Sequence, residues 1–173
     1  MILDGLLQFS GVNGDSPTAT GVSTNIIDLH LVGIPVLANL QGARDMGIGD
    51  KPALKLLVQV TTAFTGLTSL AVALQGATDN GAGAPAAFTT WWTSPAVLLA
   101  SLTAGARLYD MDMPRPPAGV AVPRFLQMSY TVAGTGTGGV IKAYIVIDRM
   151  DQMYNATNNA IHGGYPAGII ITN

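Results

Sequence analysis

The chain has no cysteine, no glutamate and little charge of either sign. Its 8 Lys and Arg and its 10 acids, all aspartate, make up 10% of 173 residues, against about 25% in an average soluble domain. Without cysteine there are no disulfides, thiolate metal sites or cysteine nucleophiles. A formal charge of −2 leaves no basic surface for nucleic acid and no polybasic segment for an anionic membrane. So few ionisable groups predict a protein that is not an enzyme and that holds no cofactor or metal.

What remains is 49% hydrophobic and rich in glycine, with 21 Gly. A surface that faces only water has about 25–35% charged residues, so this composition predicts a protein that works against other proteins. No apolar run reaches the ~20 residues of a membrane-spanning helix. The opening residues 1–11 lack the positive segment and the long apolar run of an export signal.

Aliphatic and polar residues alternate along much of the chain, which predicts half-buried strands. The longest such segments are 54–61, 70–75, 126–132 and 141–147, and shorter ones lie at 25–31, 88–92, 96–102 and 168–172. About eight short strands with frequent turns predict a single all-β domain over 1–173, a sandwich or barrel. Residues 1–10 and 150–173 are predicted to be contact extensions of that domain.

The breaks between strands carry turn residues. Ala63–Gly66 is predicted to close a hairpin between strands 54–62 and 67–75. The glycine-rich segment 134–139 is predicted to be the tip that joins two long strands. Asp79–Pro85 is predicted to be a loop. Asp110–Pro117 is stiffened by proline and is predicted to lie outside any central ladder.

None of the motifs points to catalysis. Segment 134–139 is followed by an alternating strand, not by the Lys-Ser/Thr and helix of a phosphate loop. His30 and His162 stand without a Gly-x-Ser-x-Gly turn, so structural roles are favoured. The acids are candidates for an ion site, but solvated loop positions are favoured because convergent oxygen ligands are missing. These acids are Asp110, Asp112, Asp148 and Asp151.

Contact residues are predicted where large apolar groups lack an obvious place in a core. Neighbours on a strand point to opposite faces, so one of Trp91 and Trp92 is a candidate for a partner contact; the alternative is that both are inside. The Ile169–Ile171 run is an aggregation hazard unless it is paired as an edge strand. The predicted contact residues are Leu6, Leu7, Phe9, Trp91, Trp92, Met111, Met113, Ile169, Ile170 and Ile171.

Seven segments, in order over most of residues 1–150, resemble the jelly-roll capsid cement (decoration) proteins of short-tailed bacteriophages. These segments are Met1–Asp4 with Leu6–Ser10, then Ser23–Leu29, Ala43–Gly47, Phe64–Gln75, Leu102–Arg107, Arg124–Val132 and Ala143–Arg149. Each alone is a plausible strand or turn, and their order and spacing carry the resemblance. Residues 31–41 resemble an insertion, and the tail beyond Asp151 is longer than is usual in that family.

The resemblance implies an antiparallel double-sheet jelly roll that clamps neighbouring major capsid subunits on the outer surface of the virion. It implies a homodimer, with a trimer as the alternative, and no catalytic residues. A second hypothesis is a carbohydrate-binding β-sandwich, alone or in a phage adhesin, because jelly rolls serve both roles. In that case Trp91, Trp92, Tyr109 and Tyr165 would form the sugar platform.

Overall fold

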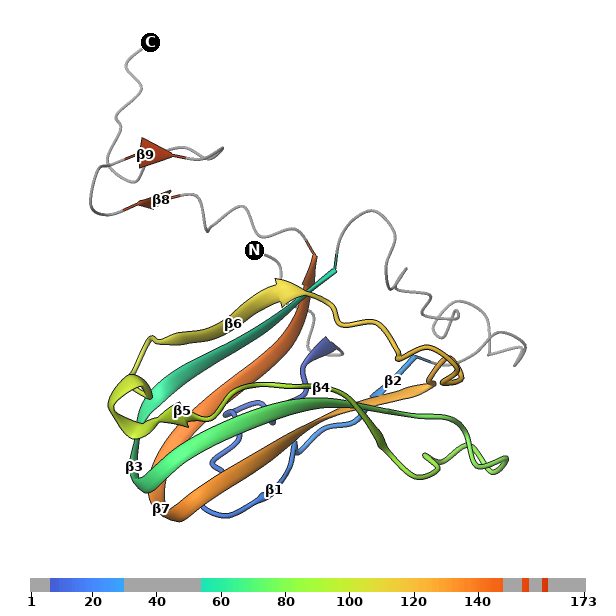
Figure 1. Ribbon diagram of the computed structural model, residues 1–173, viewed down its shortest axis with the longest axis horizontal. Coiled ribbons are helices and arrows are strands. Elements are labelled where there is room, and N and C mark those ends of the chain that lie inside the picture. The colour runs from blue at the N-terminus through green and yellow to red at the C-terminus, as the bar shows by residue number, and fades with distance from the viewer. Residues whose placement is uncertain (1–6, 30–53, 148–153, 156–159, 162–173) are drawn as a thin grey trace.

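A computed structural model of the chain describes residues 7–29, 54–147, 154–155 and 160–161. Two long strands dominate it, β3 (Leu54–Ala77) and β7 (Phe125–Ile147). They pair antiparallel along their whole length, from Leu54 opposite Ile147 to Ala77 opposite Phe125. The described part has strands and one short 3-10 helix but no α-helix, which confirms the all-β prediction. Figure 1 shows the two strands running side by side as one ribbon.

The ribbon bends in its middle without ending. The register shifts several times between Val60 and Ser69, yet Thr65 stays opposite Gly138 and Leu67 opposite Gly134. The prediction of a hairpin at Ala63–Gly66 is therefore wrong, and so is the prediction of a strand-joining tip at 134–139. Glycines with positive φ bend the strands at this point: φ is +81° at Gly66, +82° at Gly134 and +120° at Gly139. Glycine adopts these angles without a Cβ clash, so both strands turn the corner while pairing continues.

Residues 89–112 run along the side of β3 that faces away from β7, and they follow the same bend. The elements are β4 (Thr89–Thr93), β5 (Val97–Leu98), the 3-10 helix η2 (Leu99–Ser101) and β6 (Arg107–Asp112). β4 and β5 pair with the second half of β3, and β6 pairs with its first half. Asp110–Asp112 belong to β6, which pairs only with β3 among the described strands, so the prediction that Asp110–Pro117 lies outside any central ladder is not contradicted. The prolines begin only at Pro114, so 110–112 keep the amide groups that the ladder needs.

The N-terminal segment runs along the side of β7 that faces away from β3, and it follows the same bend. β1 (Gly21–Val22) and β2 (Ile27–Asp28) pair with the first half of β7. Isolated bridges join Gln8 to Tyr144 and Asp15 to Ile141 in its second half. Segment 8–28 therefore lies along one edge of the sheet, and 89–112 lies along the other.

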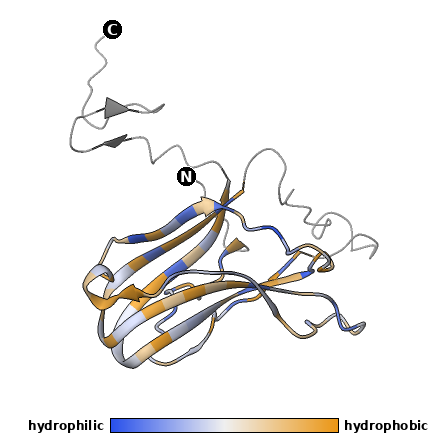
Figure 2. Cartoon of the chain, in the orientation of Figure 1, coloured by the Kyte–Doolittle hydropathy of each residue, from blue (hydrophilic) through white to orange (hydrophobic). Residues whose placement is uncertain are grey.

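The bend brings the two halves of the sheet onto one core. Figure 2 shows the alternation of apolar and polar residues along β3 and β7. The core side chains come from both halves of both strands and from the N-terminal segment; they include Phe9, Leu56, Val58, Leu70, Leu74, Leu126, Met128, Tyr130, Ile141 and Ile145. A smaller cluster of Leu57, Tyr144 and Val146 lies on the other side of the ribbon.

β8 (Tyr154–Asn155) and β9 (Ala160–Ile161) form a separate two-stranded sheet. Several predictions fall outside the described residues. They concern Leu6, His30, Asp148, Asp151, His162, Tyr165, the strand at 168–172 and the Ile169, Ile170 and Ile171 run.

Candidate interaction site

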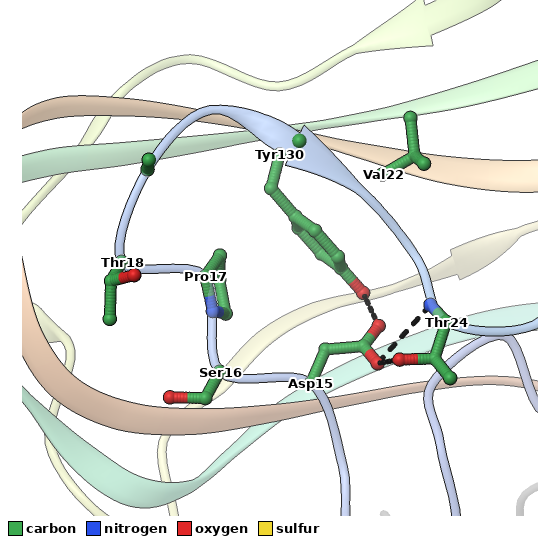
Figure 3. Close-up of a pocket in the computed structure, with 9 residues that line it drawn as sticks. Asp15, Ser16, Pro17, Thr18, Val22, Thr24 and Tyr130 are labelled. Carbon is green, nitrogen blue, oxygen red and sulfur yellow. Dashed lines mark hydrogen bonds between the residues drawn. The ribbon is translucent and has the colours of Figure 1, made fainter.

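At the N-terminal edge of the sheet lies a cavity of about 270 Å³ that is open to solvent on one side (Figure 3). Its wall is mostly the loop between the Asp15 bridge and β1, and Tyr130 of β7 reaches it from the core. The lining residues are Asp15, Ser16, Pro17, Thr18, Ala19, Gly21, Val22, Thr24 and Tyr130. Hydroxyl groups and one carboxylate make this a polar cavity, and Val22, 57% exposed, adds an apolar rim.

Asp15 holds the loop in place from both its backbone and its side chain. Its N–H donates to the Ile141 carbonyl and its carbonyl accepts from the Ile141 N–H, both at 2.9 Å. Its Oδ1 accepts from the Thr24 hydroxyl at 2.6 Å, from the Thr24 N–H at 3.3 Å and from the Gly11 N–H at 3.1 Å. Its Oδ2 accepts from the Tyr130 hydroxyl at 2.7 Å (Figure 3). Asp15 thereby joins three separate parts of the chain although it is only 6% exposed.

The Tyr130 hydroxyl is held in its protonated form. Burial raises its pKa far above the ordinary value, and the neighbouring Asp15 charge and hydrogen bond raise the pKa further. A phenol in this state donates a hydrogen bond and does not act as a base or nucleophile. The Asp15–Tyr130 pair therefore fits a structural or binding role.

The opposite edge is closed by aromatic rings. Trp92 of β4 contacts Tyr109 of β6, with ring centroids 5.0 Å apart and planes at 77°. Each residue is paired with a core residue of β3, Trp92 with Leu74 and Tyr109 with Val58. The contact therefore joins the two halves of the folded sheet. Edge-to-face is a preferred geometry for such pairs.

Trp91 lies on β4 at the register shift between β4 and β3. Its indole covers Gly76, where an added Cβ would come within 2.3 Å of the ring. Its Nε1 is buried without a hydrogen-bond acceptor in the part of the chain that is described. A small cavity of about 60 Å³ lies beside this ring, between it and the segment 120–123.

The loop end of the sheet is tied by one arginine. Arg124, 9% exposed, donates to both carboxylate oxygens of Asp28, at 2.9 and 3.0 Å, and also to Asp79. Its guanidinium carbon lies 4.8 Å from the centre of the Phe125 ring. The hydrogen bond and charge of Asp28, with those of Asp79, raise the Arg124 pKa. The Gly81 N–H, with the Gly83 N–H and Arg124, lowers the Asp79 pKa.

The predicted contact residues fall into different places. Leu7, Phe9 and Met113 lie in the chain's own core, at 9%, 0% and 6% exposure, so their side chains are not open to a partner in this fold. Their segments are predicted correctly as apolar, but the residues face the sheet because each segment runs along it. Trp91, Trp92 and Met111 are half-buried against the core.

The structure reveals exposed aliphatic side chains that the sequence interpretation missed. They are Val12, Val22, Ile26, Leu98, Val120 and Val122, with exposures of 83, 57, 44, 63, 36 and 70%. An isolated valine in a polar stretch is a weak signal, although Val12 and Val22 both stand beside glycine and polar residues typical of surface turns.

The sugar-platform and ion-site hypotheses concern other residues. The rings of Trp92 and Tyr109 cross at 77° and so present no shared flat face to a sugar. Asp112, one of the candidate ion-site acids, forms an ion pair with Lys55 at 2.8 Å. Among the described residues no three His, Cys, Asp or Glu side chains gather as a metal site, and none of the described helices is long and apolar enough to cross a membrane.

These features define an all-β protein built on one folded antiparallel sheet, with a polar cavity at one edge and exposed aliphatic groups at both. The Bbp16 family model matches residues 12–145, so the chain belongs to the Bbp16 family. The search of curated proteins finds no match.

Proposed function

We propose that this Bbp16-family protein is a capsid cement protein, which binds neighbouring major capsid subunits on the outer surface of a virion and stabilises the shell. Its fold would be a jelly roll. Four chain passes each contribute to both halves of the sheet, which is consistent with the eight-strand arrangement of that fold. The order is 8–15, 140–147, 54–60, 107–112 in one half and 21–28, 125–134, 67–77, 89–98 in the other.

One observation carries the proposal: exposed aliphatic residues stand at both outer edges of the sheet. Val22 on β1 is 57% exposed and Leu98 on β5 is 63% exposed, and β1 and β5 lie on opposite sides of the β3–β7 ribbon. A protein that binds one partner needs one such edge, whereas a protein wedged between neighbours uses two. Charged residues make up only 10% of the chain, so burial of its surface involves little ionic desolvation.

The partners in this proposal are the major capsid protein and a second copy of the chain, with a dimer as the expected state and a trimer as the alternative. Each contact is modest, since apolar burial stabilises by about 25 cal/mol per Å² before association costs are subtracted. Many copies acting together would stabilise the shell through mass action.

The test uses the purified chain and particles assembled from the major capsid protein of the same genome. Co-sedimentation should show saturable binding, and the decorated particles should resist heating better than the bare ones. Val22→Asp combined with Leu98→Asp should abolish binding. The matched control is Thr103→Asp combined with Thr135→Asp, which adds the same two charges at exposed, non-aliphatic positions.

The proposal fails if the wild-type chain does not sediment with the particles. It also fails if the variant with Val22→Asp and Leu98→Asp, folded by circular dichroism, binds as tightly as the control with Thr103→Asp and Thr135→Asp. The carbohydrate-binding hypothesis would then be preferred if a glycan array gave specific hits.

A further inference from the structure

We infer that the cavity beside Asp15 receives a basic side chain, lysine or arginine, from a neighbouring protein subunit. The inference deepens the proposed function and rests on it for the identity of the neighbour as a shell protein. The cavity itself, its charge and its remaining hydrogen-bonding capacity are properties of the free chain.

The first reason is an uncompensated charge. Asp15 is 6% exposed and has no cation within ion-pair distance among the residues that the structure describes. The nearby Lys142 forms no ion pair with Asp15 among the described contacts, and its Nζ donates instead to the Val12 carbonyl at 3.1 Å. A carboxylate shielded from water interacts strongly with any opposite charge brought beside it.

The second reason is unused acceptor capacity. An ionised carboxylate has about four lone-pair sites, two on each oxygen. Asp15 Oδ1 accepts three hydrogen bonds, whereas Oδ2 accepts only that of Tyr130. The Tyr130 hydroxyl donates its hydrogen bond to Asp15, and its oxygen keeps its lone pairs as acceptors. Two acceptors 2.7 Å apart, Asp15 Oδ2 and Tyr130 Oη, therefore stand next to one another at the cavity wall (Figure 3).

The third reason is the shape and lining of the cavity. A volume of about 270 Å³ has room for one long side chain. Pro17 and the exposed Val22 line it, which suits the aliphatic stem of a lysine or arginine whose charged end lies deeper. Ser16 and Thr18 add hydroxyl oxygens as further acceptors for the N–H groups of the lysine or arginine.

A bare metal ion fits this cavity less well. Hard cations such as calcium take six to eight oxygen ligands, and the cavity offers a single carboxylate whose Oδ1 is already saturated. A guanidinium or ammonium group brings its own directed donors and needs only one or two acceptors. The geometry thus favours a basic side chain over a free ion.

The experiment titrates the full chain with N-acetyl-arginine amide and follows backbone amide resonances by NMR. Shifts are expected at residues 15–24 and at Tyr130, with saturation. N-acetyl-citrulline amide, of the same shape but uncharged, should bind about tenfold or more weakly because a charge-assisted hydrogen bond is lost. Potassium and calcium chloride at matched ionic strength should leave these resonances in place.

Two variants test whether Asp15 and the cavity around it bind the arginine probe. Asp15→Asn should abolish the arginine-specific shifts, whereas Asp112→Asn, which removes the same charge on β6, should leave them unchanged. If Asp15→Asn does not fold, Ala19→Leu serves instead, because it narrows the cavity from its exposed rim and keeps every hydrogen bond of Asp15. Ala19→Leu should reduce both the shifts and the binding to particles.

The inference is overturned if citrulline and arginine probes shift the same resonances equally, if neither shifts them, or if an inorganic cation reproduces the shifts. It is also overturned if Ala19→Leu binds the arginine probe as the wild type does. These outcomes concern the free chain alone. Loss of particle binding by the wild type would instead contradict the proposed function.

Discussion

 

The rings of Trp92 and Tyr109 are in edge-to-face contact, with centroids 5.0 Å apart and planes at 77°, although the residues are 17 positions apart along the chain. Trp92 belongs to β4 and Tyr109 to β6, and these strands pair with opposite halves of β3. Their edge-to-face contact therefore links the two halves of the folded sheet at the edge away from the N-terminal segment.

A double-mutant cycle should measure this link. Trp92→Leu and Tyr109→Leu should each destabilise the fold, and their coupling energy should be about 0.5–1.5 kcal/mol, as found for aromatic pairs. Unfolding in urea gives the free energies. The cycle of Trp91→Leu with Tyr109→Leu is the control, and it should be additive within about 0.5 kcal/mol because these rings share no contact. Equal coupling in both cycles would contradict a specific ring contact.

Tyr130→Phe should lower the free energy of unfolding by about 1.5–3 kcal/mol, since the hydrogen bond that it removes goes to a charged group. The phenol donates to Asp15 Oδ2 at 2.7 Å and is 1% exposed. Tyr144→Phe is the matched control, because no hydrogen bond of the Tyr144 hydroxyl is seen to the described residues and the loss should be small. A Tyr130→Phe protein as stable as Tyr144→Phe would show that the Asp15 contact adds nothing to stability.

Gly139→Ala should destabilise the bend by roughly 2–5 kcal/mol, the sum of a left-handed backbone penalty and overpacking. At Gly139 φ is +120°, and an added Cβ would lie 2.4 Å from the Phe64 ring and 2.7 Å from its Cα. Gly21→Ala meets no atom closer than 3.9 Å and should change stability by less than about 0.5 kcal/mol. Thermal unfolding of both variants makes the comparison, and similar midpoints would argue against a glycine requirement at the bend.

Asp79 should make stability depend on acid. Its pKa in the folded chain lies below the ordinary value of 3.8, chiefly because the Gly81 N–H donates to it, with Gly83 and Arg124 adding to the effect. Because the Asp79 pKa is lower in the folded chain than in the unfolded chain, ionised Asp79 stabilises the folded state. This stabilisation is fully present at pH values above the ordinary pKa of the carboxyl and is lost as pH falls through the folded-state pKa. Urea unfolding between about pH 7 and about pH 2 measures the dependence.

In that series Asp79→Asn should be less stable at neutral pH and should lose stability less steeply in acid. Asp112→Asn removes an exposed carboxylate paired with Lys55. Its free energy of unfolding should fall in acid as steeply as that of the wild type. Parallel pH profiles for wild type and Asp79→Asn would exclude Asp79 as a source of the acid sensitivity.

The sequence by itself determined the local pattern. Alternation placed Leu56, Val58, Leu70 and Met128 on buried faces, and all four are in the core. This succeeded because a strand's side chains alternate between faces whatever its neighbours are. The low charge and the absence of cysteine likewise follow from the residues alone.

Only the tertiary structure decided what the glycines do. From the sequence, Gly66 and Gly134 are predicted to be turn residues. Glycine with a positive φ occurs both in a turn that reverses the chain and in a bend within a paired strand, so the residue type does not distinguish the two. The difference lies in whether pairing continues on the other side, which depends on residues some 70 positions away. The same is true of the cavity: Asp15, Thr24 and Tyr130 are unremarkable one by one, and contacts between distant segments bring them together. Local propensity cannot encode such contacts, because they exist only once the sheet has folded over its core.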